Sequence, residues 1–211
     1  MSFGGWQEEA LEFYEGLAAD NTKSYWSRHK AVYEEHVLRP MTELLDELAP
    51  EFGQPKIFRP YRDVRFSKDK TPYKTHIGAL VGSGYIQLSA TGLRVGSGMY
   101  HLAPDQLDRY RRAVADDIPG GELERIIAGL RQQQLDVAGS DPLKTAPRGY
   151  QADHPRIWLL RYKGLIAWKE WPVAAWLGTA AAKDRIAGVL TASRPLGAWL
   201  AAHVGPSSQP G

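Results

Sequence analysis

The sequence predicts an α+β fold, in which a mainly antiparallel sheet at about residues 56–100 packs with N- and C-terminal helices. Apolar side chains recur every three or four residues before this stretch and again after it, which is typical of amphipathic helices. Within the stretch, short runs of alternating apolar and polar residues are joined by turns. These turns are too short for the helical crossovers that parallel strands need, so we expect antiparallel pairing.

The N-terminal part is expected to form two helices. The first is indicated by apolar residues on one helical face: Trp6, Ala10, Phe13, Tyr14 and Leu17. The polar run 20–22 ends it and caps a second helix, which we expect to extend from about Thr22 to Ala49 and to cover the sheet. Pro40 has no amide hydrogen, so this second helix is expected to kink or restart there.

The middle of the chain is expected to form five strands that make an antiparallel meander. Strand-forming runs occupy 56–59, 64–66, 75–81, 85–90 and 93–99. An irregular turn separates the first two runs, and glycine-containing turns join the last three.

The C-terminal half returns to helical periodicity. We expect helices that start at Pro104 and near Leu123, a strand at 165–168, a helix from Pro172 to about Leu190, and a short helix around Trp199. No repeat or linker divides the chain, so residues 1–204 are predicted to form a single α+β domain. Residues 205–211 offer no apolar anchor and are predicted to be a disordered tail.

The composition excludes several kinds of chemistry. The 211 residues are 43% hydrophobic and 24% charged, which is ordinary for a globular protein. The absence of cysteine excludes disulfides, thiolate catalysis and zinc sites with sulfur ligands. His29 and His36 lie seven residues apart, whereas a helical metal pair is usually four apart, so no metal site is predicted. The sequence identifies no cofactor and no oligomeric state.

The N-terminus and the hydropathy pattern predict a cytoplasmic protein. The first residues lack the basic and apolar regions of a signal peptide. No apolar run approaches the roughly 18 residues of a membrane span, so no membrane partner is expected.

The segment 59–74 concentrates positive charge and is the main candidate for a functional site. It holds six cations and two acids, a local net charge of +4, against +2 for the whole chain. Guanidinium and ammonium groups bind phosphate or carboxylate oxygens, and the interleaved aromatic rings are suited to stacking. The predicted anion-binding residues are Arg59, Arg62, Arg65, Ser67, Lys68, Lys70 and Lys74.

An alternative interpretation of this segment is purely structural. Arg62 with Asp63, or Lys68 with Asp69, would then neutralise each other within the fold. If residues 63–66 form a regular strand with Val64 turned to the core, Asp63 faces solvent or a cleft, because alternate side chains share a face.

The residues Arg62 to Lys74 also carry a resemblance to a known family. The run matches Arg-Asp-x-Arg-Phe-Ser-Lys-Asp-Lys-x-Pro-Tyr-Lys, which resembles the hallmark of a bacterial and fungal family catalogued as a conserved domain of unknown function. Residues 21–26, 147–150 and 153–155 are similar to further family motifs, so the resemblance spans about residues 10–170. It implies no activity, substrate or cofactor, but it implies that the basic segment belongs to the family's shared design.

Three functions are compatible with these observations. The first is a domain that binds an anionic ligand through residues 59–74, either a phosphorylated small molecule or a nucleic acid. The second is an enzyme that acts on such a ligand, with Asp63 or His76 transferring the proton. The third is a protein interaction module whose surface is formed by C-terminal tryptophans: Trp158, Trp168, Trp171, Trp176 and Trp199.

Overall fold

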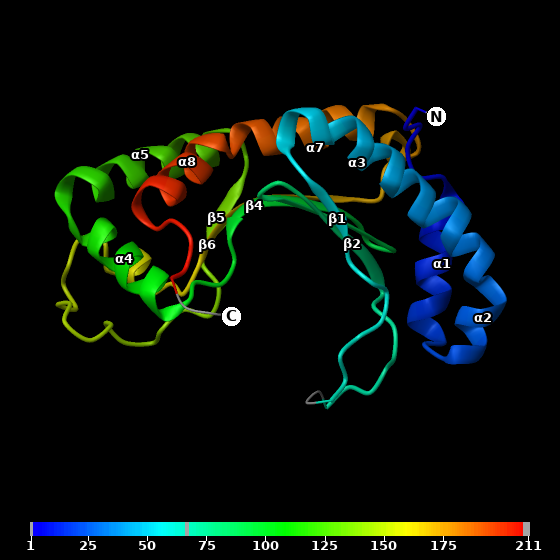
Figure 1. Ribbon diagram of the computed structural model, residues 1–211, viewed down its shortest axis with the longest axis horizontal. Helices are drawn as coiled ribbons and strands as arrows, with labels where there is room; N and C mark the ends of the chain where they lie inside the picture. The colour runs from blue at the N-terminus through cyan, green and yellow to red at the C-terminus, as the bar shows by residue number, and fades with distance from the viewer. Residues whose placement is uncertain (1, 66–67, 209–211) are drawn as a thin grey trace. The chain divides into compact units, whose positions relative to one another are not determined.

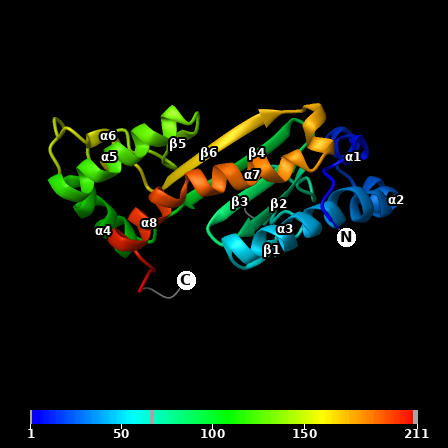
Figure 2. The same ribbon diagram turned by 90° about the horizontal axis from the view of Figure 1, so that it is seen from above.

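Figures 1 and 2 present a computed structural model of the chain, in which residues 2–65 and 68–208 are described. Its strands form a six-stranded antiparallel sheet in the order β1-β2-β3-β4-β6-β5, and the remaining elements are mainly helices. The α+β class predicted from the sequence is therefore confirmed.

The chain divides into two compact units, which are described separately below. Unit 1 comprises residues 1–95 and 170–188, and unit 2 comprises residues 96–169 and 189–211. The boundaries fall inside three elements, which are β4 (Gly92–Met99), β6 (Leu165–Pro172) and α7 (Ala181–Ala192).

The helices of unit 1 begin with α1 (Glu8–Ala19) and α2 (Lys23–Val32), and the Thr22 hydroxyl caps α2 by accepting the Tyr25 N–H. A π-helical turn (Tyr33–Leu38) and α3 (Arg39–Phe52) follow without a break. The expected single helix therefore contains a wider turn before Pro40, because this proline has no N–H to donate to the carbonyl of His36, four residues earlier. The last helix of the run continues past Ala49 and ends at Gly53, whose φ of 109° suits a glycine.

The strands of unit 1 are β1 (Pro55–Ile57), β2 (His76–Val81), β3 (Gly84–Ser89) and the start of β4. One face of the sheet is apolar and at most 2% exposed: Ile77, Ala79, Val81, Ile86, Leu88, Leu93 and Val95. Figures 1 and 2 show α3 and α7 over this face. The larger side chains on the other face of β2 and β3 (His76, Leu80, Tyr85 and Gln87) are only partly buried, which defines an open face of the sheet.

The expected strand at 64–66 is wrong for the described residues 64 and 65, which lie outside any strand, while Phe66 is not among the described residues. These residues belong instead to a long excursion between β1 and β2, which extends away from the sheet in Figure 1. We refer to residues 59–74 as the basic arm.

A short η2 helix (Ala175–Gly178) holds the N-terminal segment in unit 1, because the Trp6 N–H donates to the Leu177 carbonyl over 2.7 Å. The Phe3 N–H donates to the Glu47 carboxylate over 2.7 Å, and the Lys183 ammonium lies 2.5 Å from the same group. The hydrogen bond from Lys183, followed by that from the Phe3 backbone, lowers the pKa of Glu47 to about 2.

Unit 2 contains α4 (Pro104–Ala115), α5 (Asp117–Gln132), α6 (Ile157–Leu160), α8 (Arg194–His203) and β5 (Asp136–Ala138), a strand that the sequence did not indicate. The Arg156 guanidinium is buried where α4 ends. It donates to the Val114 carbonyl over 2.7 Å and to the Asp117 carboxylate over 2.8 Å. It thereby satisfies helix-terminal carbonyls that would otherwise lack donors.

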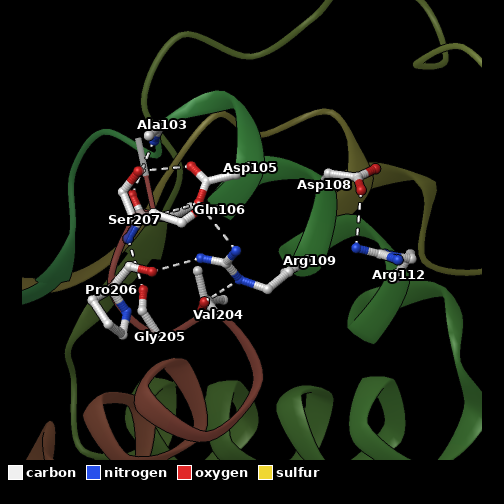
Figure 3. A network of polar contacts seen from close by, with 11 residues as sticks. Ala103, Asp105, Gln106, Asp108, Arg109, Arg112, Val204, Gly205, Pro206 and Ser207 are labelled. Carbon is white, nitrogen blue, oxygen red and sulfur yellow. Dashed lines mark hydrogen bonds and ion pairs between the residues drawn. The ribbon is translucent and has the colours of Figure 1, made fainter. Parts of the chain in front are cut away.

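The C-terminal segment lies against α4, as Figure 3 shows. The Gln106 amide donates to the Gly205 carbonyl over 2.7 Å. The Arg109 guanidinium donates to the Val204 carbonyl over 2.5 Å and to the Pro206 carbonyl over 2.7 Å. All of these acceptors are backbone carbonyls, so the contacts do not depend on side chains of the tail.

Asp105 completes this network (Figure 3). Its carboxylate accepts the Ser208 N–H over 2.9 Å and the Ser207 hydroxyl over 2.8 Å, and it pairs with Arg109 over 3.0 Å. These donors, the Ser208 backbone foremost, hold the pKa of Asp105 well below its usual value. The described part of the expected tail is thus in polar contact with α4, a feature that the sequence does not indicate.

Every helix among the described residues is too short or too polar to span a lipid bilayer.

We expect a chain that ends at Val204 to unfold in one cooperative transition, close to the melting temperature of the full chain. The described residues of this segment, 205–208, bury no apolar side chain, water replaces their hydrogen bonds, and the Asp105–Arg109 pair remains. One transition is expected because β4, β6 and α7 each contribute residues to both units. Calorimetry measures both quantities. A loss above about 1 kcal/mol would identify a packed terminus, and two separate transitions would identify two domains.

Glu47 is expected to make the stability of unit 1 depend on pH. Its pKa in the folded chain, about 2, lies below the usual 4.5, so its contribution is complete above about pH 4.5 and disappears as the pH falls toward 2. Glu47→Gln should therefore lower the melting temperature at pH 7 and have little effect at pH 2. The exposed neighbour Asp46 provides the control, because Asp46→Asn should change neither end of the profile. Parallel profiles for Glu47→Gln and wild type would contradict this.

Candidate functional site

The basic arm begins as an irregular continuation of the β1–β2 pair. The Lys74 N–H donates to the Pro60 carbonyl over 2.8 Å, and the Arg62 N–H donates to the Pro72 carbonyl over 2.9 Å. The two sides of the arm therefore run antiparallel beyond the sheet, and cations from both sides are brought together.

A change of register separates the arm from the sheet. Ile57 pairs with Ala79 in the sheet, and Tyr61 pairs with Tyr73 in the arm. Between these pairs the first side advances four residues and the second six, so two extra residues bulge from the side that carries Lys74. Such a bulge bends a strand and re-aims its side chains, which explains why the arm leaves the plane of the sheet.

The base of the arm is fixed to the N-terminal helices. The Asn21 amide donates to the Tyr73 carbonyl over 3.0 Å and accepts the Tyr73 N–H over 3.1 Å. The Tyr73 ring stacks on Trp26 with 4.4 Å between centroids and an interplanar angle of 6°. The Tyr61 ring lies beside this pair, with 5.4 Å between its centroid and that of Tyr73. These contacts join two stretches that the sequence analysis singled out separately.

Both carboxylates of the arm are held by arginines of the arm. Arg62 forms an ion pair with Asp69, and Arg65 binds Asp63 through two nitrogens, with the closer contact 2.7 Å. The pKa of Asp69 is lowered to about 2, first by the N–H of Thr71 and then by Arg62. The hydrogen bonds from Arg65 likewise lower the pKa of Asp63. Asp63 is therefore ionised and engaged at neutral pH, which makes it a poor proton acceptor.

The remaining residues predicted for the anion site differ in their surroundings. The Lys70 ammonium donates to the Val64 carbonyl over 2.9 Å, which closes the outer part of the arm. Lys68 is exposed near the tip, and Ser67 lies outside the described residues. Arg59 and Lys74 lie at the base, close to the sheet.

Three cations lie near one another at the base of the arm, and two of them flank one aromatic ring. The ammonium groups of Lys56 and Lys74 lie 5.9 and 5.5 Å from the centroid of the Phe58 ring. Partial burial, followed by the positive charge of Arg59, lowers the pKa of Lys74. Among the described residues, none of these three cations forms an ion pair.

His76 begins β2 beside this group. Burial, and then the charge of Lys74, lowers the pKa of His76, so the imidazole is neutral at pH 7 and able to accept a proton. Of the two proton-transfer candidates, His76 has the more suitable protonation state.

The open face of the sheet adjoins the same group. Tyr85 and Gln87 lie on this face, and the Tyr85 hydroxyl donates to the Gln87 amide oxygen over 2.8 Å. The Tyr85 ring lies over Gly78 of β2. A Cβ atom on residue 78 would be only 2.9 Å from the phenolic oxygen of Tyr85, so the ring occupies space that a larger residue would need. The rings of Phe58 and Tyr85 are 6.4 Å apart between centroids. The site thus combines cations with half-buried aromatic rings.

A separate pocket of about 410 Å³, which no sequence pattern indicates, lies in unit 1 between the N-terminal segment and the π-helical turn. Its lining includes Glu35, His36 and Arg39, and Glu9 lies 4.0 Å from the His36 ring. A π-helical turn often marks a functional position, but sequence periodicity does not reveal it. In the described part of the chain, no cluster of three or more His, Asp or Glu side chains is suited to a metal ion.

The C-terminal tryptophans do not form an exposed surface. Trp199 is 2% exposed and donates to the Pro119 carbonyl over 2.9 Å. The Arg185 guanidinium lies over the Trp176 ring, 4.6 Å from the ring centroid. Every tryptophan in the described ranges is at least partly buried, so no observation favours the interaction module.

Comparison with protein families matches residues 9–199 to the family described as conserved hypothetical protein (DUF2461), and the chain belongs to this family. The hallmark motif and the bacterial and fungal range inferred from the sequence stay predictions. A solved structure of a conserved hypothetical protein from Pyrococcus furiosus aligns with a TM-score of 0.40 and 11% identity, over 81% of this chain and 97% of that chain. This likeness carries no argument about function. The curated proteins contain no match.

Arg65→Glu is expected to leave the fold intact, because this side chain is 77% exposed and its ion pair is at the surface. Asn21→Ala removes both hydrogen bonds to Tyr73 and should cost roughly 1–2 kcal/mol. Urea unfolding gives the free energy of unfolding of each variant. Arg65→Glu reports on the tip of the arm, and Asn21→Ala reports on its base. Strong destabilisation by Arg65→Glu would assign the whole segment to folding and would argue against an anion site at the tip.

Proposed function

We propose that this protein binds a phosphorylated or otherwise anionic ligand through the basic arm, chiefly at its base, where Lys56 and Lys74 flank Phe58 and Arg59 lies near Lys74. The supporting observation is an imbalance of charge. None of these cations forms an ion pair at contact distance among the described residues. Arg59 acts on Asp63 only at longer range, and both acids of the arm are paired with other arginines.

Electrostatics explains why an anion is favourable at this position. Like charges that converge beside a partly buried ring repel one another, and the lowered pKa of Lys74 is a consequence of this repulsion as well as of burial. An anion between the cations reverses the repulsion and favours the charged form of Lys74. The Arg59 guanidinium matches two oxygens of a phosphate at once, and an ammonium group adds a single strong contact.

A second candidate function is an enzyme that acts on the same ligand. The observation that favours it is the neutral His76 beside Lys74, because a neutral imidazole next to a bound anion is positioned to take a proton. In this case His76→Gln should retain ligand binding and abolish turnover of phosphorylated compounds. Equal turnover by wild type and variant, or none by either, would leave binding as the function.

Inorganic phosphate is expected to raise the melting temperature of the wild type. At ten times the dissociation constant, selective binding to the folded chain contributes about 1.4 kcal/mol, or roughly 3–5 °C for a chain of this size. Arg59→Gln and Lys74→Gln should each reduce this shift to less than half. Differential scanning fluorimetry at constant ionic strength, with chloride replacing phosphate, measures the effect.

The matched control is Lys144→Gln, which removes an exposed lysine from a loop of unit 2. This variant should show the full phosphate shift. An equal shift in all variants would indicate a general salt effect and would overturn the proposed site.

A further inference from the structure

We infer that the ligand is a single-stranded nucleic acid, with its phosphates on the basic arm and its bases on the open face of β1–β3. This inference rests on the anion site proposed above and adds the chemical class of the ligand. Its argument comes from the aromatic and amide groups beside the cations, which a simple anion does not require.

The aromatic rings of the open face are suited to stacking. Phe58 and Tyr85 lie on either side of β2, are both partly buried, and have 6.4 Å between their ring centroids. Gly78 lies between them on β2 and leaves room for the Tyr85 ring to lean across the strand. Aromatic side chains on an exposed sheet face are a common platform for unpaired bases.

Gln87 adds a group suited to recognition of a base edge. It pairs with Gly78 in the register of β2 and β3, so it lies on the same face of the sheet as the two rings. Its amide oxygen accepts the Tyr85 hydroxyl over 2.8 Å, which fixes the orientation of the amide. The amide nitrogen has no protein acceptor among the described residues, and glutamine amides are well matched to base edges.

The spread of these groups favours a strand over a free nucleotide. Small ligands usually occupy concave sites that bury most of their surface. Here the cations, the rings and the amide extend across β1, β2 and β3, about 10 Å at the usual strand spacing. Lys68 and Lys70 continue the positive charge along the arm. Such a row of cations suits successive phosphates, and each phosphate contact adds to the salt dependence of binding.

The test is fluorescence anisotropy with a labelled 12-nucleotide oligothymidylate and with an abasic strand of the same length. The wild type should bind the base-bearing strand about tenfold more tightly than the abasic strand, which corresponds to stacking of one or two bases. Tyr85→Leu should bring the two affinities together. Lys74→Gln should weaken both and reduce the slope of log K against log salt by about 0.7.

Two controls and one further variant accompany the test. Tyr100→Leu and Lys144→Gln remove an exposed tyrosine and an exposed lysine of unit 2, and both should bind as the wild type does. Phe58→Leu tests the same platform if Tyr85→Leu does not fold, as judged by its melting temperature.

The outcomes separate this inference from the proposed function. Equal affinity for both strands, weakened by Lys74→Gln, would overturn the nucleic acid and leave the anion site in place. Thymidine monophosphate that competes as well as the strand, at equal nucleotide concentration, would overturn the strand in favour of a free nucleotide. No binding of either strand, together with no phosphate shift, would overturn both proposals.

Discussion

The contact between Tyr73 and the Asn21–Trp26 turn is the constraint on which the candidate site depends. A sixteen-residue arm outside the sheet has few apolar groups of its own to order it. Two hydrogen bonds from one amide side chain and a stacked ring pair supply this order where the arm leaves the sheet. Because Tyr73 directly precedes Lys74, the same contact also sets the position of the cations at the base.

Within the arm, position determines which charges remain available. The arginines toward the tip are neutralised by the acids of the same segment, although the pairs are Arg62 with Asp69 and Arg65 with Asp63 rather than those that the structural interpretation named. At the base, the bulge on the Lys74 side turns this residue toward Phe58, where partial burial makes solvation of its charge less effective. The structural interpretation therefore fits the outer part of the arm, and the anion site that we propose lies at its base.

The sequence was sufficient for features that depend on short-range patterns. Strand-forming runs at 75–81 and 85–90 predicted β2 and β3, and short turns predicted their antiparallel pairing. It was insufficient where two or more elements determine the result. The residues of the π-helical turn before Pro40 have the same three- and four-residue apolar spacing as the helices around it, so the spacing suggested one continuous helix. The pairing of Arg62 with Asp69, rather than with Asp63, depends on how the arm folds back on itself. The contacts of the C-terminal segment with α4 use mostly backbone carbonyl and N–H groups, which no side-chain pattern reveals.

The open face of β1–β3 is the part of unit 1 that folding explains least. A sheet packed on one side needs solvent-compatible residues on the other, and serine, threonine or paired charges are sufficient for this purpose, as Arg94 with Glu170 illustrates. Phe58 and Tyr85 are instead large rings that stay partly exposed, and Gly78 sacrifices strand propensity to accommodate one of them. Unpaired cations at the edge of the same face add a second cost. Partly exposed rings and unpaired cations each reduce the stability of the chain without a ligand, and both occur at one place. A ligand that contacts the rings and the charges together would account for both.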